Sequence, residues 1–350
     1  MSIEEQGPSH LGAREGLLLR PLRRLAAMAL ITVALVLWIW GNQAVGYSNL
    51  PGAALRAVAG WTYTLGTLGL FLFLPSLWKA GAAFLGISGL LIVWWSFIPA
   101  SNDRDWVPDL ARQPHATIAG ELVTLHDIRD FDWKNGTDDY VVNYYDETFD
   151  LGLINQVDLV ICYWDEQRAI AHTILSFGFS DGKRVAVSIE IRREKNESYD
   201  TLKGIYKQFE LFYVVASETD VVKVRTNRRG EEVYLYPTLA TPEQARALFL
   251  SYVHRINKLA EDPEFYHTIF NNCTTNIIDH INQVMPTPVP FQKKVLLNGY
   301  SDELAYELGW LDDSTPYADL RRQHFISKIA QAADSAPDFS ARIRELPEAH

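Results

Sequence analysis

The sequence predicts an α+β fold in which an antiparallel sheet with flanking helices is preceded by three transmembrane helices. Three observations support this prediction. The first 100 residues contain three long apolar runs, the residues after them contain short β-branched and aromatic segments, and helical patterns begin near positions 241 and 273. The chain has 350 residues, which is enough for one large domain or two modest ones.

The three apolar runs are residues 25–45, 60–78 and 81–99. Each approaches the roughly 20 residues that a helix needs to cross the bilayer core, and Trp38 and Trp40 lie where an interfacial aromatic belt is expected. A cleaved signal peptide is the alternative for the first run. It is disfavoured because no clear cleavage site of small residues follows, and because two further apolar runs do.

Basic residues set the expected orientation. A basic cluster between Arg14 and Arg24 precedes the first run, and Lys79 lies between the second and the third. The positive-inside rule places both in the cytoplasm. The sequence therefore predicts a cytoplasmic N-terminus (residues 1–24), a three-helix transmembrane region (residues 25–100) and a domain outside the cytoplasm (residues 101–350).

Charge and cysteine content exclude several classes of function. Residues 1–100 carry a net charge of +3, which leaves −14 for the rest of the chain. An acidic domain argues against a nucleic acid partner. The two cysteines, Cys162 and Cys273, have neither the spacing of a zinc site nor that of a disulfide-rich fold, and we expect no cofactor and no metal. Cys162 lies in an apolar segment and is expected to be a buried strand residue.

Short segments with β-branched and aromatic residues are predicted to be strands: 123–131, 157–164, 170–179, 184–193, 209–216, 221–225 and 233–236. The clearest hairpin joins residues 170–179 to residues 184–193. A three-residue Ser180-Asp181-Gly182 loop, with Gly182 in the left-handed conformation, pairs Phe179 with Lys183.

This register places His172 directly opposite Glu190, with Ser188 and Arg192 on the same face of the hairpin. The other face carries apolar side chains and is expected to be a core face. A two-residue turn would shift the register by one residue and place Ile191 opposite His172 instead.

Two helices are predicted after the strands. Thr241 and Pro242 are typical of the N-cap and first position of a helix, which runs to about residue 260. The second helix begins at Cys273, because an Asn pair precedes this residue and apolar residues at helical spacing follow it to Val284. A helix N-terminus favours an anion, so this position stabilises a thiolate. His267 lies nearby but would need an unusual turn to act as the base.

Cys273, His172 and Glu190 therefore form a candidate nucleophile, base and orienting carboxylate. The histidine precedes the cysteine, which is the reverse of ordinary papain-like enzymes and the order that a circularly permuted papain-like fold gives. Each residue also has a purely structural interpretation. Cys273 can be a small buried residue, His172 a packed strand residue, and Glu190 a partner of Arg192 or Arg193.

Several motifs between residues 105 and 310 stand together: Ala171-His172-Thr173-Ile174-Leu175-Ser176-Phe177, Ser188-Ile189-Glu190-Ile191-Arg192, Glu218-Thr219-Asp220-Val221-Val222 with Arg225, Tyr266, and Asn272-Cys273-Thr274-Thr275. This set resembles the Lnb N-terminal periplasmic domain family, which includes the Lnb-type lipoprotein N-acyltransferases of Gram-negative bacteria. Together with the orientation that the basic residues predict, this gives the expectation of a multi-pass protein of the inner membrane with residues 101–350 in the periplasm. The best-known members carry their membrane helices after the domain, whereas here the apolar runs precede it.

The resemblance further implies that Cys273 is the acyl-accepting nucleophile and His172 its base. A membrane-tethered acyltransferase would take an acyl chain from a phospholipid as a thioester and pass it to an amine, such as the N-terminus of a lipoprotein, with His172 moving the proton. An Asn side chain beside Cys273 and the Cys273 N–H are expected to stabilise the oxyanion. The expected oxyanion and positioning residues are Asn271, Asn272, Ser188, Arg192 and Tyr266.

Two other functions stay open at this stage. The same pair of residues can catalyse hydrolysis, as in a cell-wall amidase or a cysteine peptidase, which would need a wet cleft and no lipid groove. Alternatively, the chain is a non-catalytic membrane interaction protein in which Cys273 is inert.

Overall fold

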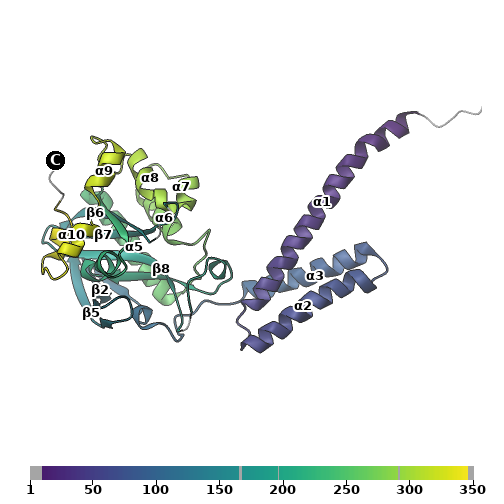
Figure 1. The fold of residues 1–350 in the computed structure, drawn as a ribbon, viewed down its shortest axis with the longest axis horizontal. Coiled ribbons are helices and arrows are strands. Elements are labelled where there is room, and N and C mark those ends of the chain that lie inside the picture. Colours follow the sequence, from purple (N-terminus) through teal and green to yellow (C-terminus); the bar gives the residue numbers. More distant parts are fainter. Residues whose placement is uncertain (1–9, 165–167, 196, 291, 346–350) are drawn as a thin grey trace, which may run out of the picture. The chain divides into compact units, whose positions relative to one another are not determined.

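The computed structural model describes residues 10–164, 168–195, 197–290 and 292–345. The chain divides into two compact units at the bond between Pro99 and Ala100. The first unit consists of three helices: α1 (His10–Gly46), α2 (Ala53–Phe73) and α3 (Leu77–Ser96) (Figure 1).

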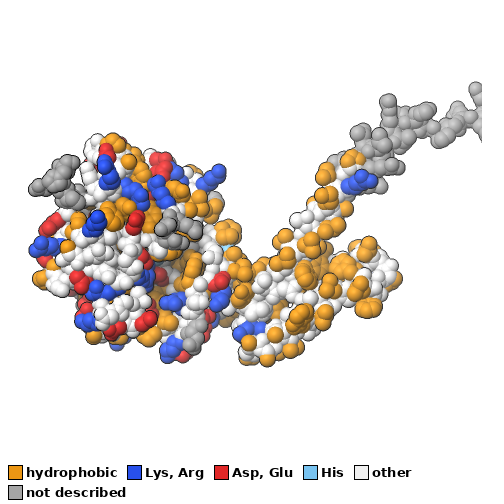
Figure 2. Space-filling model, in the orientation of Figure 1, with side chains coloured by type: hydrophobic (Ala, Val, Ile, Leu, Met, Phe, Trp, Pro, Cys, Tyr) orange, Lys and Arg blue, Asp and Glu red, His pale blue; other side chains and the backbone are white. Residues whose placement is uncertain are grey.

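Two helical stretches of the first unit are long and apolar enough to cross a membrane, Arg24–Gly46 within α1 and Leu77–Ser96, which is α3. Figure 2 shows apolar side chains over much of the visible surface of these helices, as expected for contact with lipid. Over the described part of the chain α2 does not reach the same hydropathy. The prediction of three transmembrane helices is therefore corrected to two candidate spans.

The polar residues that lower the hydropathy of α2 pair with its neighbours inside the bundle. Trp38 Nε1 donates to Thr67 Oγ1 at 3.1 Å, and the hydroxyls of Tyr63 and Ser88 lie 3.5 Å apart. Such hydrogen bonds between helices are common where the surroundings are apolar. Two crossings place both ends of this unit on one side of a membrane and three place them on opposite sides, so the cytoplasmic location of residues 1–24 stays a prediction.

The second unit is built on an eight-stranded sheet in the order β1-β2-β9-β8-β7-β6-β10, with β5 paired to β2. The β2–β9 pair is parallel and its other pairs are antiparallel. The strands are β1 (His115–Ala119), β2 (Leu122–Arg129), β5 (Tyr144–Asp150), β6 (Ile154–Tyr163), β7 (His172–Phe179), β8 (Arg184–Arg192), β9 (Glu210–Ala216) and β10 (Glu232–Pro237); β3 (Asp132–Trp133) and β4 (Tyr140–Val141) form a separate ribbon.

Helices cover both faces of this sheet. Helices α5 (Pro242–Glu261) and α6 (Cys273–Val284) contribute to the apolar core on one face, and α4 (Glu218–Val221), α10 (Ser327–Ala332) and α11 (Phe339–Arg342) to the core on the other. Figure 1 shows α6 grouped with α7 and α8. The remaining helical elements are η1 (Pro108–Leu110), η2 (Leu151–Leu153), η3 (Lys203–Ile205), η4 (Val224–Arg228, a π-helical turn), α7 (Lys293–Leu296), η5 (Asn298–Tyr300), α8 (Ser301–Glu307) and α9 (Tyr317–Gln323).

The predicted α+β class, with a mostly antiparallel sheet and flanking helices, is confirmed, whereas the circularly permuted papain-like arrangement stays a prediction. The helix start at Thr241 is also confirmed, because Thr241 forms a capping box with Gln244. The strand predicted at 221–225 is wrong, since α4 and η4 occupy that stretch. Ser217 accepts a hydrogen bond from the Asp220 N–H and caps α4, which overrides the strand preference of the valines.

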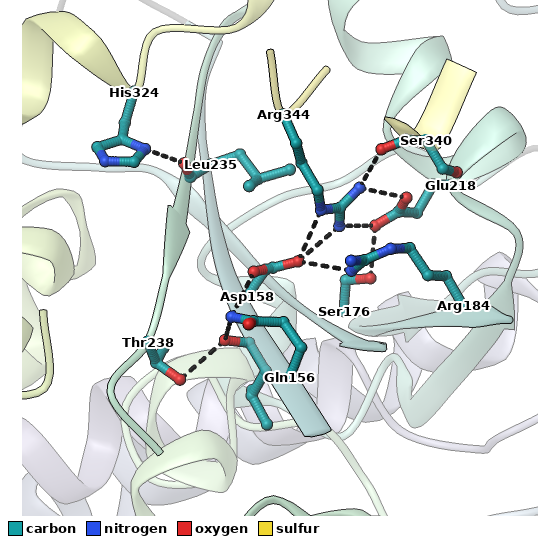
Figure 3. Close-up of polar contacts among 11 residues, drawn as sticks. Gln156, Asp158, Ser176, Arg184, Glu218, Leu235, Thr238, His324, Ser340 and Arg344 are labelled. Carbon is teal, nitrogen blue, oxygen red and sulfur yellow. Dashed lines mark hydrogen bonds and ion pairs between the residues drawn. The ribbon is translucent and has the colours of Figure 1, made fainter. Parts of the chain in front are cut away.

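The C-terminal segment is held to the sheet by Arg344. Arg344 Nη2 pairs with Asp158 Oδ2 at 2.6 Å and with Glu218 Oε1 at 2.5 Å, and Ser176 Oγ donates to the same Glu218 oxygen (Figure 3). Both carboxylates are buried. Buried charges require such partners, so Arg344 anchors the chain end to the sheet face that carries α11. Residues 346–350 lie outside the described residues.

Candidate active site

Cys273 is the first residue of α6 and is 7% exposed. The preceding Asn272 caps the helix. Its Oδ1 accepts from the Thr275 N–H at 3.0 Å, and the Thr275 hydroxyl accepts from the Asn272 N–H at 2.9 Å. This capping box fixes the helix start, so the Cys273 thiol lies in the first turn, at the positive end of the helix dipole.

The β7–β8 hairpin brings His172 to Glu190 in the predicted register. Ile174 pairs with Ser188, and two residues further along the same register His172 lies opposite Glu190. The loop is the three-residue one expected: the Phe179 N–H donates to the Lys183 carbonyl, and Gly182 has a φ of 88°. His172 Nε2 lies 3.2 Å from Glu190 Oε1.

Ser188 lies between the imidazole and the carboxylate. Its Oγ is 2.6 Å from His172 Nε2 and donates to Glu190 Oε1 at 2.7 Å. A hydroxyl has one proton, and Ser188 gives it to Glu190, so the hydroxyl accepts from a protonated Nε2. The ring nitrogen left for proton transfer with a nucleophile is therefore Nδ1. Ser188 thus holds the tautomer of His172.

The thiol and the imidazole interact, and each shifts the pKa of the other. Burial raises the pKa of Cys273, but the hydrogen bond and positive charge of His172 outweigh burial and the net shift is downward. Burial and the Arg225 charge lower the pKa of His172, but Glu190 and the Cys273 thiol outweigh them and the net shift is upward. Both shifts favour a thiolate–imidazolium pair, the reactive form of a cysteine nucleophile.

Arg225 also belongs to this site. The motif set included this residue, but no role was expected for it. Its Nη2 donates to Glu190 Oε1 at 3.1 Å, and its Nη1 pairs with Glu231 Oε2 at 3.1 Å. Burial raises the pKa of Glu190, but His172 and then Arg225 reverse this, and it lies well below the usual range. Glu190 is therefore ionised and pairs with His172 and Arg225, not with Arg192 or Arg193.

Asn298, in η5, is the second such residue. Its Nδ2 lies 3.7 Å from Cys273 Sγ, and its Oδ1 accepts from the Ala171 N–H at 2.9 Å. The second contact fixes the amide so that its N–H side faces the sulfur. Asn298 lies 25 residues after Cys273, in a segment whose sequence has no periodic pattern. The sequence signal nearest to it is the Ala171-His172 motif, whose Ala171 N–H it contacts.

The amides of Asn271 and Asn272, expected as oxyanion donors, have other partners. Asn271 Nδ2 donates to the Phe265 carbonyl at 2.9 Å, and Asn272 Nδ2 donates to the Thr268 carbonyl at 2.7 Å. These bonds build the turn before α6. The Cys273 N–H belongs to the first turn of α6, whose N–H groups have no acceptor within the helix.

The other expected site residues are placed differently. The Arg192 guanidinium lies between Trp106 and Phe212 and donates to Asn102 and to other oxygens of the segment 102–113, so it supports the fold rather than the thiol. Tyr266 is buried, and burial followed by the nearby Cys273 raises its pKa, so its phenol stays neutral.

The remaining histidine and cysteine near the site are structural. His267 Nδ1 accepts from the N–H groups of Ile269 and Phe270 within its own turn, so it is not the base. Cys162 is fully buried and lies opposite His172 across the β6–β7 pair. Burial raises the pKa of Cys162 to about 12, so its thiol stays neutral despite this neighbour. Within the described ranges no group of three His, Cys, Asp or Glu side chains has a geometry that would hold a metal ion.

Residues 140–299 match the family described as Lnb N-terminal periplasmic domain, the family that the motifs indicated. The matched region contains His172, Glu190, Arg225, Cys273 and Asn298. Comparisons with curated proteins and with solved structures each gave no match. The family match and the two apolar helices indicate a membrane-associated protein with a periplasmic domain.

Proposed function

From the premise that residues 140–299 form an Lnb N-terminal periplasmic domain, we propose that this protein is a membrane-tethered cysteine acyltransferase. It moves an acyl chain from a phospholipid through a thioester on Cys273 to an amine, with the N-terminus of a lipoprotein as the proposed acceptor. The observation that carries the proposal is the arrangement of three side chains: Cys273 begins α6 with the Asn298 amide 3.7 Å from its sulfur, and the His172 imidazole, which shifts the pKa of the thiol downward, is held by Ser188 and Glu190.

In the first half-reaction the Cys273 thiolate attacks the carbonyl carbon of the phospholipid ester. The Cys273 N–H and the Asn298 amide donate to the oxyanion that forms, a stabilisation worth about 3 kcal/mol per donor in comparable sites. The carbon–oxygen bond then breaks, and the leaving alkoxide takes the proton from His172 Nδ1. The products are an acyl thioester on Cys273 and a lysophospholipid.

In the second half-reaction an uncharged amine attacks the thioester carbonyl. His172 Nδ1, now neutral, accepts a proton from the amine nitrogen as the carbon–nitrogen bond forms. The carbon–sulfur bond breaks, which releases the amide and regenerates the Cys273 thiolate beside a protonated imidazole. Throughout the cycle Glu190 and Ser188 hold Nε2 protonated, so only Nδ1 exchanges protons.

The apolar rim of the site favours a lipid donor over a soluble peptide or glycan. We define this rim by the exposed apolar side chains Ile170, Ile269, Phe270, Leu296 and Leu297, of which Phe270 is 72% exposed. Each lies within four residues of His172, Cys273 or Asn298 in the sequence. Exposed apolar side chains gathered at one place are typical of contact with a membrane or a partner surface. A cell-wall amidase or peptidase would instead need a polar, wet entrance.

We place the protein in the inner membrane as a multi-pass protein through α1 and α3, with the second unit in the periplasm. The family description supports the periplasmic location, and the two apolar helices support the membrane location. Alkaline phosphatase fused after residue 350 should be active, since this enzyme folds only outside the cytoplasm. An inactive fusion whose cytoplasmic reporter counterpart is active would contradict the proposed orientation.

Mass spectrometry of the purified full-length protein tests the proposed function. After incubation with phospholipid vesicles, we expect an acyl adduct on the peptide that contains Cys273, and we expect hydroxylamine to remove it. The peptide with Cys162 is the internal control and should stay unmodified. Absence of the adduct, together with release of free fatty acid, would favour the hydrolase. Absence of both would favour a non-catalytic interaction protein.

A further inference from the structure

A deep apolar cavity of about 270 Å³ lies between α6, α8 and the sheet face that α6 covers. It begins one side chain from the thiol. Thr274 lines the cavity, and its hydroxyl lies 3.8 Å from Cys273 Sγ. Thr173, the residue after His172, also lines it. The cavity therefore begins beside the thiol, near the start of β7.

Three elements show that the cavity extends away from the thiol. Along α6 it is lined from Thr274 to Val284, ten residues that rise by about 15 Å. Along the sheet the lining begins at Thr173 of β7 and reaches Val157 of β6, which pairs with Phe177 of β7. The advance of four residues along β7, from Thr173 to Phe177, spans about 14 Å. The two lengths agree. The walls of α8 follow the same direction, starting beside Asn298.

The polarity of the lining changes along this length. Near the thiol the walls carry the hydroxyls of Thr173, Thr274 and Ser301, and among the described residues those of Thr173 and Ser301 have no hydrogen-bond partner. Further along, the walls consist mostly of apolar side chains such as Ile281 and Trp310. Buried hydroxyls without a partner are costly unless a ligand supplies one. The cavity thus matches a ligand that is polar at one end and apolar along the rest.

We propose that this cavity binds the acyl chain of the thioester and limits the length of chain that it encloses. The proposal rests on the proposed acyltransferase function. The carbonyl end lies among the hydroxyls near Cys273, and the terminal methyl group points toward Trp310. A cavity of roughly 150 Å³ holds one benzene ring, so about 270 Å³ encloses a chain on the order of ten carbon atoms. The carbon atoms of a longer chain that lie outside the cavity add no further binding free energy from burial in it.

A series of p-nitrophenyl esters from butanoyl to hexadecanoyl tests this. They are offered to the full-length protein in detergent, with p-nitrophenol release as the readout and intact mass confirming the adduct on Cys273. Acylation rates should rise by about two- to fourfold for each added methylene, because each one leaves water for the cavity. The increase should stop near decanoyl.

Two substitutions should move this limit in opposite directions. Ala305, 2% exposed, lines the middle of the cavity, so Ala305→Leu should shift the limit about three carbons shorter. Trp310→Ala should shift the limit of chain length to longer chains. This variant still tests the cavity if Ala305→Leu fails to fold. Ala330→Leu is the matched control, since Ala330 is equally buried but lies in the core on the opposite face of the sheet.

The outcomes separate this inference from the proposed function. Acylation of Cys273 at the same rate by every ester, or length profiles that neither cavity variant changes, would overturn the acyl cavity and leave the thiol chemistry standing. No acylation by any ester would refute the proposed function, and this inference with it.

Discussion

Glu190→Gln removes a charge from the site while keeping its shape. The contacts of Glu190 with His172, Ser188 and Arg225 all use Oε1. A glutamine carbonyl oxygen can occupy the same position, with its amide group in place of Oε2. The side chain then still accepts from the Ser188 hydroxyl, and His172 keeps its orientation. What changes is the charge beside the imidazole.

The lost charge should lower the pKa of His172. Burial and Arg225 already lower it, and Glu190 is the main group that raises it. A carboxylate at this range shifts the pKa of its partner by about 1 to 3 units. Because Glu190 is 28% exposed, we expect about one unit, which corresponds to about 1.4 kcal/mol. Cys273 then loses part of the imidazolium charge, its own pKa rises, and turnover at neutral pH falls about tenfold.

The rate at which iodoacetamide alkylates Cys273, followed by mass spectrometry across a range of pH, measures this directly and needs no substrate. In the unaltered protein the midpoint should lie below the value of about 8.5 for a free thiol, and in Glu190→Gln it should lie about one unit higher. Glu264→Gln is the matched control, because Glu264 is 29% exposed and pairs with Arg255 and Lys258 rather than with the imidazole or Arg225. Equal midpoints in Glu190→Gln and the unaltered protein would refute the role of Glu190.

Further substitutions test the remaining parts of the site and the fold. Cys273→Ser should abolish transfer of labelled acyl groups and Cys162→Ser should retain most of it, because burial keeps the second thiol neutral; substantial activity in Cys273→Ser would exclude it as the nucleophile. His172→Ala should lower the transfer rate by a similar factor, and the double variant with Cys273→Ser should be little slower than either single variant. If the two losses of rate multiply, the residues do not act as a coupled pair. Asn298→Ala should lower kcat about 100-fold with a small change in KM, and an unchanged kcat would exclude its amide from the oxyanion site. Arg344→Met leaves the buried Glu218 without an arginine and Asp158 with Arg184 alone, and should lower the free energy of unfolding measured in urea by about 3 kcal/mol, with a loss below about 1 kcal/mol counting against the anchor.

The parts of the site that local sequence specifies were predicted. The Ser180-Asp181-Gly182 loop determines its own conformation, because Gly182 takes the left-handed position without strain, and the loop then determines which residues of β7 and β8 face each other. Cys273 was placed correctly for a similar reason, since the residues around it form a capping box within four positions. In both cases residues close in the chain decide the structure.

The parts that depend on distant contacts were missed. The run around Arg225 contains several valines and was predicted as a strand, but the cap at Ser217 and burial in the core on the α10 face make it helical. Asn298 reaches the thiol only because α6, α7 and η5 fold back on one another. The Asn272 amide shows the opposite error, since a residue that caps a helix has already committed its side chain and cannot also hold an oxyanion.

The arrangement around Glu190 explains why a carboxylate can serve here as the orienting group. A carboxylate alone with an imidazole would raise the pKa of His172 further, and Nδ1 would then give up its proton less readily in the proposed cycle. Arg225 acts against this, because its charge lowers the pKa of His172 while its Nη2 occupies the same Glu190 oxygen. Glu231 in turn pairs with the other end of Arg225 and keeps that charge compensated in a buried place. Arg225 therefore limits the rise in the pKa of His172 that Glu190 causes, and the proposed two-step acyl transfer needs such a limit because its imidazole must both give and take a proton.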